Sequence, residues 1–360
     1  MTDLKVYTVI GLMSGTSVDG VDVALIKTDG LRVIEPLRFA TYPYTAKERE
    51  IIRAAFGKRG YNDIVEEAEA VVTTAHLRAL ADFKASADLI GFHGQTILHD
   101  PLQRVTWQIG DAQALARSLS IPVMAQMRLA DVKAGGQGAP LLPLYHQARA
   151  EGRPRPMAVV NIGGVSNITY LGTGDEVMAC DCGPGNALID DFMLARLGTP
   201  FDQDGQMAAG GIVQEQLLMA CLAHPYFKKP IPKSLDRNEF EPLPPELSPQ
   251  PSSLRDQDVV ATLTAFTVES IVKSTELFPE RIQECLVTGG GRHNQTMMRN
   301  LSDRLGIPVH PVEYAGWQGD ALEAEGFAYL AVRALKGLPL TLPLTTGAPH
   351  PLTGGVLFHP

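Results

Sequence analysis

Residues 5–27 read KVYTVIGLMSGTSVDGVDVALIK and predict a β-hairpin. An apolar strand runs into a turn rich in Gly, Ser and Thr, and a second strand follows with apolar residues alternating at Val21 and Val23. The Asp19-Gly20 pair is a strong hairpin signal. Glycine at a strand end lets backbone amides converge on an anion, so this turn is also a candidate phosphate site.

A second hairpin with the same organisation is predicted at residues 157–171, MAVVNIGGVSNITYL. A chain of 360 residues exceeds the size at which a single core stops growing. We therefore expect two lobes, each opening with a hairpin aimed at a common cleft. The first lobe is expected over residues 1–150, onto which a segment from the C-terminal end can pack back, and the second over residues 151–360.

The remainder of the chain alternates between strand and helix patterns, which predicts an α/β fold. Helical periodicity is expected at residues 46–86, 111–119, 185–198, 257–277 and 319–335, and strands at 88–98, 121–126 and 284–288. Residues 230–256 contain many prolines and are expected to form a long loop or lid.

Charge and hydropathy argue against a nucleic-acid-binding, a secreted or a membrane-spanning protein. The net charge is -9, from 31 basic and 40 acidic residues, and no run of Lys and Arg forms a stripe that could track a nucleic-acid backbone. The N-terminal residues show no secretory cleavage pattern, and apolar runs elsewhere are too short to cross a bilayer. We expect a cytoplasmic protein with neither a nucleic-acid partner nor a membrane partner.

The four cysteines, Cys180, Cys182, Cys221 and Cys285, are too few and too scattered for a disulfide framework. Cys180 and Cys182 lie two residues apart, but no second Cys or His pair has the spacing of a zinc site. We therefore expect reduced, buried thiols.

Glycine-rich turns follow apolar strands at four places: 11–20, 135–138, 163–164 and 289–291. A single such turn is more often only a tight turn, but four of them favour nucleotide binding. Neither a Walker loop nor a GxGxxG fingerprint is present. Phosphate binding must then use the paired hairpins and a separate adenine pocket, as in the actin-like ATPases.

The sequence ACDCGPGN at residues 179–186 places Asp181 before a rigid Gly-Pro-Gly turn and the start of a helix. A carboxylate held there, close to backbone amides, is suited to act as a general base. Taken alone, the residue is equally well explained as a cap of the turn.

Four further polar residues are candidates for contacts with a ligand. His93 and Gln95 follow an expected strand in GFHGQT, where sugar or phosphate ligands are commonly held, although a lone His is more often structural. Asp111 and Glu323 are alternative bases or acceptors for sugar hydroxyls. Asp111 is equally plausible as an N-cap, and Glu323 as a solvated helical charge.

Seven motifs occur in one order along the chain: GLMSGTSVDGVDVAL, GFHGQT, ADVKAGGQGAPL, NIGGVSNIT, DCGPGNALID, VTGGGRHN and GDALEAEGFAYLA. Together they resemble the anhydro-N-acetylmuramic acid kinases from about residue 8 to about residue 355. The resemblance implies a two-lobed actin-like (RNase H-like) ATPase fold with ATP in the interlobe cleft. It also implies phosphorylation of 1,6-anhydro-N-acetylmuramic acid at its sixth-position oxygen, with opening of the anhydro bridge by water.

The resemblance assigns roles to particular residues. Asp181 becomes the base that deprotonates the attacking water, and Mg²⁺ is expected near Asp19 and Asp181 through water. The residues implied for ATP and its phosphates are Gly15, Thr16, Ser17, Asp19, Gly20, Asp22, Gly163, Gly164, Asn167, Gly289, Gly290, Gly291 and Asn294. The partners implied are ATP, an amino sugar and a second copy of the chain in a homodimer.

The chain departs from the family pattern at two places. Cys182 stands where the family usually has Thr, which leaves a weak thiol donor in place of a hydroxyl. Leu235 and Asp236 replace Thr and Gly in PKSLDRNEF, so substrate preference can have changed. A nucleotide-dependent sugar sensor and a sugar kinase that leaves the bridge intact therefore stay open as alternatives.

Overall fold

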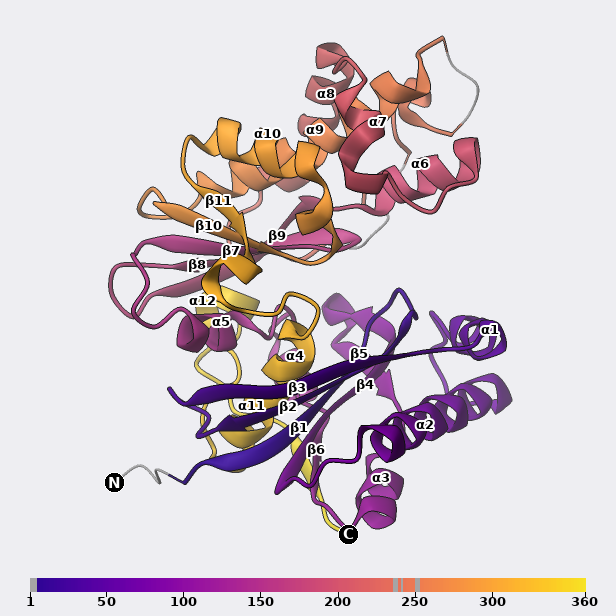
Figure 1. Cartoon of the computed structure of the whole chain (residues 1–360), viewed down its shortest axis with the longest axis vertical. Coiled ribbons are helices and arrows are strands. Elements are labelled where there is room, and N and C mark those ends of the chain that lie inside the picture. The colour runs from indigo at the N-terminus through magenta and orange to yellow at the C-terminus, as the bar shows by residue number, and fades with distance from the viewer. Residues whose placement is uncertain (1–4, 236–238, 241, 250–252) are drawn as a thin grey trace. The chain divides into compact units, whose positions relative to one another are not determined.

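The computed structural model describes residues 5–235, 239–240, 242–249 and 253–360 (Figure 1). The chain folds into two compact units. Unit 1 combines Met1–Glu151 with Ala321–Pro360, and unit 2 is Gly152–Asp320.

Unit 1 is built on a mixed sheet with the strand order β12-β6-β4-β1-β2-β3, and β5 pairs with β4. Strands β1, β2 and β3 are antiparallel, while β4 and β6 continue parallel to β1. The strands are β1 (Tyr7–Ser14), β2 (Gly20–Thr28), β3 (Ile34–Pro43), β4 (Leu89–Asp100), β5 (Val105–Ile109), β6 (Val123–Ala125) and β12 (Val356–Phe358). The predicted hairpin is the β1–β2 pair.

Unit 2 repeats this arrangement with the order β11-β10-β7-β8-β9. Strands β7, β8 and β9 are antiparallel to their neighbours in this set, and β10 and β11 continue parallel to β7. The strands are β7 (Met157–Ile162), β8 (Val165–Leu171), β9 (Val177–Pro184), β10 (Glu284–Thr288) and β11 (Val309–Pro311). The same RNase H-like order in both units confirms the predicted actin-like α/β fold, and the cleft between them stays a prediction.

Helices cover the sheets of both units (Figure 1). Unit 1 contains α1 (Ala46–Ala54), α2 (Asp63–Phe83), α3 (Ala112–Leu119), α4 (Leu129–Ala134), α5 (Pro143–Arg149), α11 (Leu322–Leu335) and α12 (Pro343–Thr346). Unit 2 contains α6 (Ala187–Leu197), α7 (Gln206–Ala209), α8 (Glu215–Leu222), α9 (Asp256–Thr275) and α10 (Gln295–Leu305). No helix in the described residues is both long and apolar enough to cross a membrane.

The C-terminal residues 321–360 pack in unit 1. The sequence allows for a C-terminal segment that packs back on the first lobe, but it does not say which residues form that segment. The reason for this placement is the close packing of α11 on β1 and β4. A Cβ atom on Gly11 would overlap the carbonyl oxygen of Ala324, and one on Gly91 would overlap that of Phe327. Glycine on the strands therefore lets the last long helix lie directly on the sheet.

Part of the proline-rich segment is anchored in the core of unit 2. Phe240 stacks on Phe227, and Leu247 in the 3₁₀ turn η4 (Pro245–Leu247) is fully buried. Before α9, the described residues of 230–256 contain neither an α-helix nor a strand, so the expectation of a long loop is confirmed. At Phe240 and Leu247 the loop is anchored, because these apolar side chains are buried against α9. Asp236 lies outside the described residues.

Candidate functional site

The turn between β1 and β2 presents Thr16, Ser17 and Asp19 to solvent. Val18 between them is fully buried in the core of unit 1 and has a φ of 59°. Positive φ is rare for a β-branched residue and is tolerated where packing over-determines the backbone. Burial of Val18 thus holds the turn in a shape that exposes the polar residues on both sides of it.

A buried network fastens this turn to the neighbouring strand. The Ser14 hydroxyl lies 2.6 Å from Gln95 Oε1 and 2.9 Å from the Tyr44 hydroxyl, and Gln95 Nε2 donates to the Gly15 carbonyl at 3.1 Å. Gln95 has no exposed surface. It was predicted from the sequence to contact a substrate, and the structure shows its amide bonded to the turn between β1 and β2.

Gly20 and Asp22 lie in β2 beyond the tip of the turn. The Asp22 carboxylate accepts a hydrogen bond of 2.6 Å from the Thr41 hydroxyl on β3. The exposed residues at the tip of this hairpin are therefore more accessible to a phosphate than Gly20 and Asp22 are. The Asp22 carboxylate is already hydrogen-bonded within the sheet.

His93 is 6% exposed and lies between Arg128 and the ring of Phe327. Its Nδ1 lies 2.7 Å from the Gly94 carbonyl, and Arg128 Nε donates to its Nε2 at 3.0 Å. Because the guanidinium can only donate, Nε2 is the acceptor and Nδ1 carries the proton. Burial, with the charge of Arg128 adding, holds the pKa of His93 well below its usual value, so the ring is neutral.

Glu323, in the first turn of α11, is partly exposed and lies in the field of Arg128. Burial raises the pKa of its carboxyl, and Arg128 opposes that shift. Its environment is therefore unlike that of a solvated helical charge. Arg128, which connects Glu323 with His93, was not among the residues predicted from the sequence, because a lone Arg carries no motif signal.

A hollow of about 370 Å³ in unit 1 brings His93 and Asp111 together, lined also by Glu69, Trp107 and Gln108. A hollow of this size fits a small ligand. Asp111 Oδ1 also accepts a hydrogen bond from the Ala114 amide at 2.9 Å. Asp111 is therefore the N-cap of α3, which is the alternative that the sequence left open. Neither Gln95 nor Glu323 lines this hollow.

In unit 2, polar side chains form a row across four neighbouring strands. Sheet register places Asp181 opposite Asn167, Asn167 opposite Asn161, and Asn161 opposite Thr288. Residues directly opposite in a sheet share a face, and their neighbours along the strands, such as Cys180 and Ile168, point into the core. Asn161 was missed from the sequence, although strand alternation places it on this face.

The two glycine motifs of unit 2 that flank this row are in contact. The Asn186 amide donates to the Gly163 carbonyl at 2.7 Å, and the Gly185 amide donates to the Gly164 carbonyl at 2.9 Å. A Cβ atom on Gly185 would overlap the Gly163 carbonyl oxygen, so only glycine allows this approach. The turn after Asp181 therefore packs directly against the β7–β8 hairpin.

The turn at Gly289–Gly291 is held by Arg292, another residue that sequence reasoning missed. The Arg292 guanidinium is buried and donates to the Gly289 carbonyl at 2.9 Å, to Glu313 at 3.0 Å and to Asp320 at 2.8 Å. Asn294, predicted to approach a nucleotide, accepts from the Met297 amide at 2.9 Å and caps α10.

Asp181 lies on β9 and is partly exposed. Its Oδ2 accepts a hydrogen bond of 2.8 Å from the Leu235 amide, and its carbonyl accepts one of 2.7 Å from the Tyr226 hydroxyl. Burial raises the pKa of the carboxyl to about 7, while the Leu235 hydrogen bond and the charge of Lys233 oppose that shift. A carboxyl with a pKa near neutrality can hold or release a proton at working pH.

Cys182 is one residue beyond Asp181 but fully buried in the core of unit 2. We expect Cys182→Thr to change kcat less than about twofold and to lower the free energy of unfolding by about 1–3 kcal/mol, because the added methyl group must fit into a packed core. The side chain points away from the face that carries Asp181, and Ser274, which already interacts with the thiol, can partner a hydroxyl. Steady-state kinetics and urea denaturation test this, and a tenfold loss of kcat with unchanged stability would contradict it.

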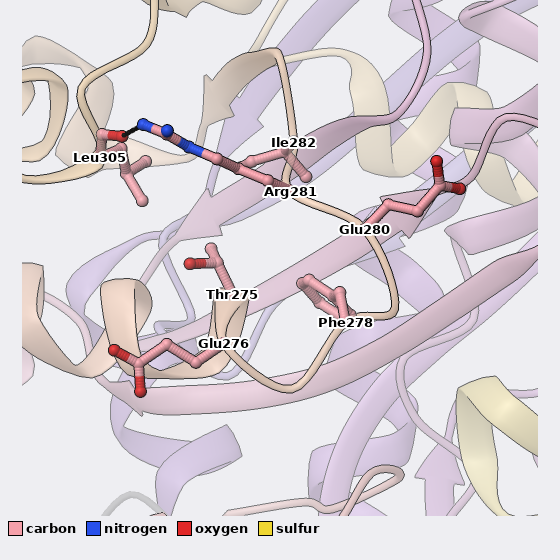
Figure 2. Close-up of a pocket in the computed structure, with 7 residues that line it drawn as sticks. All are labelled: Thr275, Glu276, Phe278, Glu280, Arg281, Ile282 and Leu305. Atoms are coloured by element: carbon pink, nitrogen blue, oxygen red, sulfur yellow. Dashed lines mark hydrogen bonds between the residues drawn. The ribbon is translucent and has the colours of Figure 1, made fainter.

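A separate hollow of about 320 Å³ lies in unit 2 beside the end of α9 (Figure 2). Figure 2 shows Arg281 reaching across it to the Leu305 carbonyl, at 3.0 Å. No residue predicted for catalysis or nucleotide binding lines it.

Comparison with known proteins covers the chain almost from end to end. The family model described as anhydro-N-acetylmuramic acid kinase matches residues 7–360. The chain is 51% identical to the anhydro-N-acetylmuramic acid kinase of Azorhizobium caulinodans, over 98% of this chain and 99% of the relative. It is 50% identical to the enzyme of that name from Rhodopseudomonas palustris strain BisB18, over 98% and 100%.

Among solved structures, a ROK family glucokinase from Streptomyces griseus with glucose and AMPPNP matches at 12% identity and a TM-score of 0.41, over 90% of this chain and 98% of that one. The sequence relatives are far more similar than this. The chain belongs to the anhydro-N-acetylmuramic acid kinase family.

Proposed function

We propose that this protein transfers the γ-phosphoryl group of ATP to the sixth-position oxygen of 1,6-anhydro-N-acetylmuramic acid while water opens the anhydro bridge. The products are N-acetylmuramic acid 6-phosphate and ADP, as needed for recycling cell-wall sugars. Membership of the family supports the kinase activity. The observation that supports ring opening is the partly exposed Asp181 carboxyl, whose pKa is raised to about 7.

The chemistry needs one base. Asp181 accepts a proton from water, the water oxygen bonds to the anomeric carbon, and the bond from that carbon to the bridging oxygen breaks. The released oxygen then takes the phosphoryl group as ADP leaves. One carboxylate can serve the whole sequence if water, sugar and ATP are aligned, because positioning supplies much of the rate in phosphoryl transfer.

ATP binding is assigned to backbone-rich turns in both units. The exposed tip residues Thr16, Ser17 and Asp19 offer hydroxyls and a carboxylate beside Gly15. In unit 2, Gly163, Gly164 and Asn167 brace phosphate, and Gly289–Gly291 approach adenosine. Turns of this kind bind phosphate through amide groups without a formal positive charge.

The residues assigned to ATP are also compatible with Mg²⁺ bound to its phosphates. It binds through one or two carboxylates together with water and substrate phosphates, so a cage of protein ligands is not required. The described residues contain no cluster of three or more His, Cys, Asp or Glu side chains able to hold a metal. The exposed carboxylate of Asp19 and that of Asp181 would hold the ion through water, and the ion would neutralise charge on the transferred phosphoryl group.

The amino sugar is assigned to contacts with His93 and Asp111, in the hollow of about 370 Å³, and with Glu323. The carboxylates suit hydrogen bonds with sugar hydroxyl and amide groups, whereas both ring nitrogens of His93 are already bonded to Gly94 and Arg128, so His93 would contact the sugar through its ring carbons. By analogy within the family, we also propose that the protein works in the cytoplasm as a homodimer.

Isotope labelling tests the proposal. The protein is incubated with ATP, Mg²⁺ and the anhydro sugar in oxygen-18 water, and the product is analysed by mass spectrometry. We expect a 6-phosphate product with the label at the anomeric position. A phosphorylated product without label would indicate a kinase that leaves the bridge intact, and ATP binding without turnover would indicate a sensor.

A further inference from the structure

Every backbone amide of the glycine-rich turn at residues 135–138 donates a hydrogen bond within unit 1. The first two amides donate to carbonyls of α4, at 3.1 and 2.9 Å. The Gln137 amide donates to the Thr346 carbonyl at 2.7 Å, and the Gly138 amide donates to Asp131 Oδ1 at 2.6 Å. Because a phosphate would need these same amides, the turn has a role other than the phosphate binding that its glycines suggest.

The buried carboxylate of Asp131 joins this turn to the C-terminal segment. Asp131 is 2% exposed, and its Oδ2 accepts a hydrogen bond of 2.6 Å from the hydroxyl of Thr346 in α12. Thr346 itself has no exposed surface. A Cβ atom on Gly136 would overlap the carboxylate, so only glycine lets the turn come this close. A carboxylate this buried depends on its hydrogen-bond donors, and two of them come from the turn and from α12.

The turn in its place holds the guanidinium of Arg128. Nη1 of Arg128 donates to the Gly138 carbonyl at 2.7 Å, and Nε donates to Nε2 of His93 at 3.0 Å. His93 lines the hollow of about 370 Å³ that is assigned to the amino sugar. Because the guanidinium is planar and rigid, a shift at its bond with Gly138 is passed on to its bond with His93.

We propose that Thr346 is a positioning residue for the amino sugar. Its hydroxyl holds the Asp131 carboxylate, the carboxylate holds the glycine turn, and the turn holds the guanidinium that orients His93 in the wall of the hollow. The inference rests on the proposed function, because it takes this hollow as the sugar site. A displacement of about 1 Å in a binding site is enough to change activity strongly, even when the altered residue lies away from the ligand.

The test measures the binding of ATP and of the anhydro sugar separately, by calorimetry, in three variants. Thr346→Val removes the hydroxyl and nearly keeps the shape of the side chain, whereas Thr346→Ser keeps the hydroxyl. Thr345→Val is the matched control. Thr345 is 2% exposed and its hydroxyl also lies near the Leu342 carbonyl, but only the hydroxyl of Thr346 bonds to Asp131.

We expect Thr346→Val to bind the anhydro sugar about tenfold more weakly, as for loss of one hydrogen bond to a charged group, and to bind ATP within about twofold of the unmodified protein. The KM for the sugar should rise by a similar factor. Thr346→Ser should return the sugar affinity to within about threefold of its original value, and Thr345→Val should bind both ligands as the unmodified protein does.

A residue that only supports the fold would weaken the binding of both ligands alike. Unchanged sugar affinity in Thr346→Val therefore overturns the inference, as does an equal loss for ATP or an equal loss of sugar affinity in Thr345→Val. If thermal melting shows that Thr346→Val does not fold, Thr346→Ala, which leaves room for a water molecule beside Asp131, is measured under the same criterion. Failure of the unmodified protein to bind the anhydro sugar would refute the proposed function, whereas sugar binding that Thr346→Val leaves unchanged refutes only the role of Thr346.

Discussion

Asp181→Asn is expected to lower kcat by roughly 1000-fold or more, as for loss of a positioned general base. Asparagine keeps the size of the side chain and can still accept from the Leu235 amide, but it cannot take a proton from water. Single-turnover formation of the 6-phosphate measures the effect. ATP affinity, measured by calorimetry, should stay within about twofold of the original, because the variant retains the shape of the site.

Retention of most activity in Asp181→Asn would move the base to another carboxylate. Glu323 would then be the stronger candidate, because its pKa is also raised by burial and it is partly exposed. Asp111 is weaker, since its carboxylate is used in capping α3.

Asp181→Asn is also expected to change how the free energy of unfolding depends on pH. The pKa of Asp181 in the folded chain, about 7, lies above its ordinary value of 3.8. The folded state then binds more protons than the unfolded state between these values, so stability falls as the pH rises through this window. We expect Asp181→Asn to remove that loss and to be at least as stable as the original protein at pH 8, as measured by urea denaturation. Lower stability at pH 8 would contradict the account of a desolvated carboxyl.

The strands around the two hairpins could be predicted because their signals are local. Alternation of apolar residues and the Asp19-Gly20 pair act within a few positions, and the second hairpin repeats the pattern at residues 157–171. The extent of the C-terminal segment that packs in unit 1, residues 321–360, could not be predicted in the same way. It depends on contact between Gly11 and Ala324, which are more than three hundred positions apart.

Prediction of the candidate site was likewise limited to residues that are marked by a local sequence signal. Asp181 was a candidate base because a glycine-proline turn follows it closely, and the structure shows that turn packed on the Gly163 hairpin. Its catalytic role stays a prediction. Lys233 and Tyr226, which contact the Asp181 backbone, come from elsewhere in the chain. The segment PKSLDRNEF was noted only for its departures at Leu235 and Asp236, and no motif marks Tyr226. Their relation to Asp181 is created by tertiary folding and is invisible in local spacing.

The type of a polar residue alone also did not show whether it contacts a ligand or supports the fold. Asp111 and Asn294 cap helices, and Gln95 fastens the first turn. A side chain that can bind a sugar hydroxyl can equally bind a backbone amide, so only the position of the partner decides between the two roles.

Gly11→Ala is expected to destabilise unit 1 by about 3 kcal/mol or more, at the upper end of overpacking effects. The added methyl group would overlap the backbone of α11 at Ala324, and a backbone atom in a packed helix cannot rotate away. Because whole domains are stable by only about 5–15 kcal/mol, the variant should melt at a clearly lower temperature or fail to accumulate in folded form. Differential scanning calorimetry with Mg²⁺ and without nucleotide gives the measurement.

Gly15→Ala is the matched control from the same hairpin. A Cβ atom there would meet only the Ser17 hydroxyl oxygen, at 3.6 Å, which is an ordinary contact. We expect this variant to fold normally but to bind ATP about ten- to a hundredfold more weakly, because the methyl group obstructs one charge-assisted amide–phosphate hydrogen bond of about 1.5–3 kcal/mol. Equal melting temperatures for Gly11→Ala and the original protein would refute the close packing of α11. Unchanged ATP affinity in Gly15→Ala would instead move the phosphate away from the tip of the first hairpin.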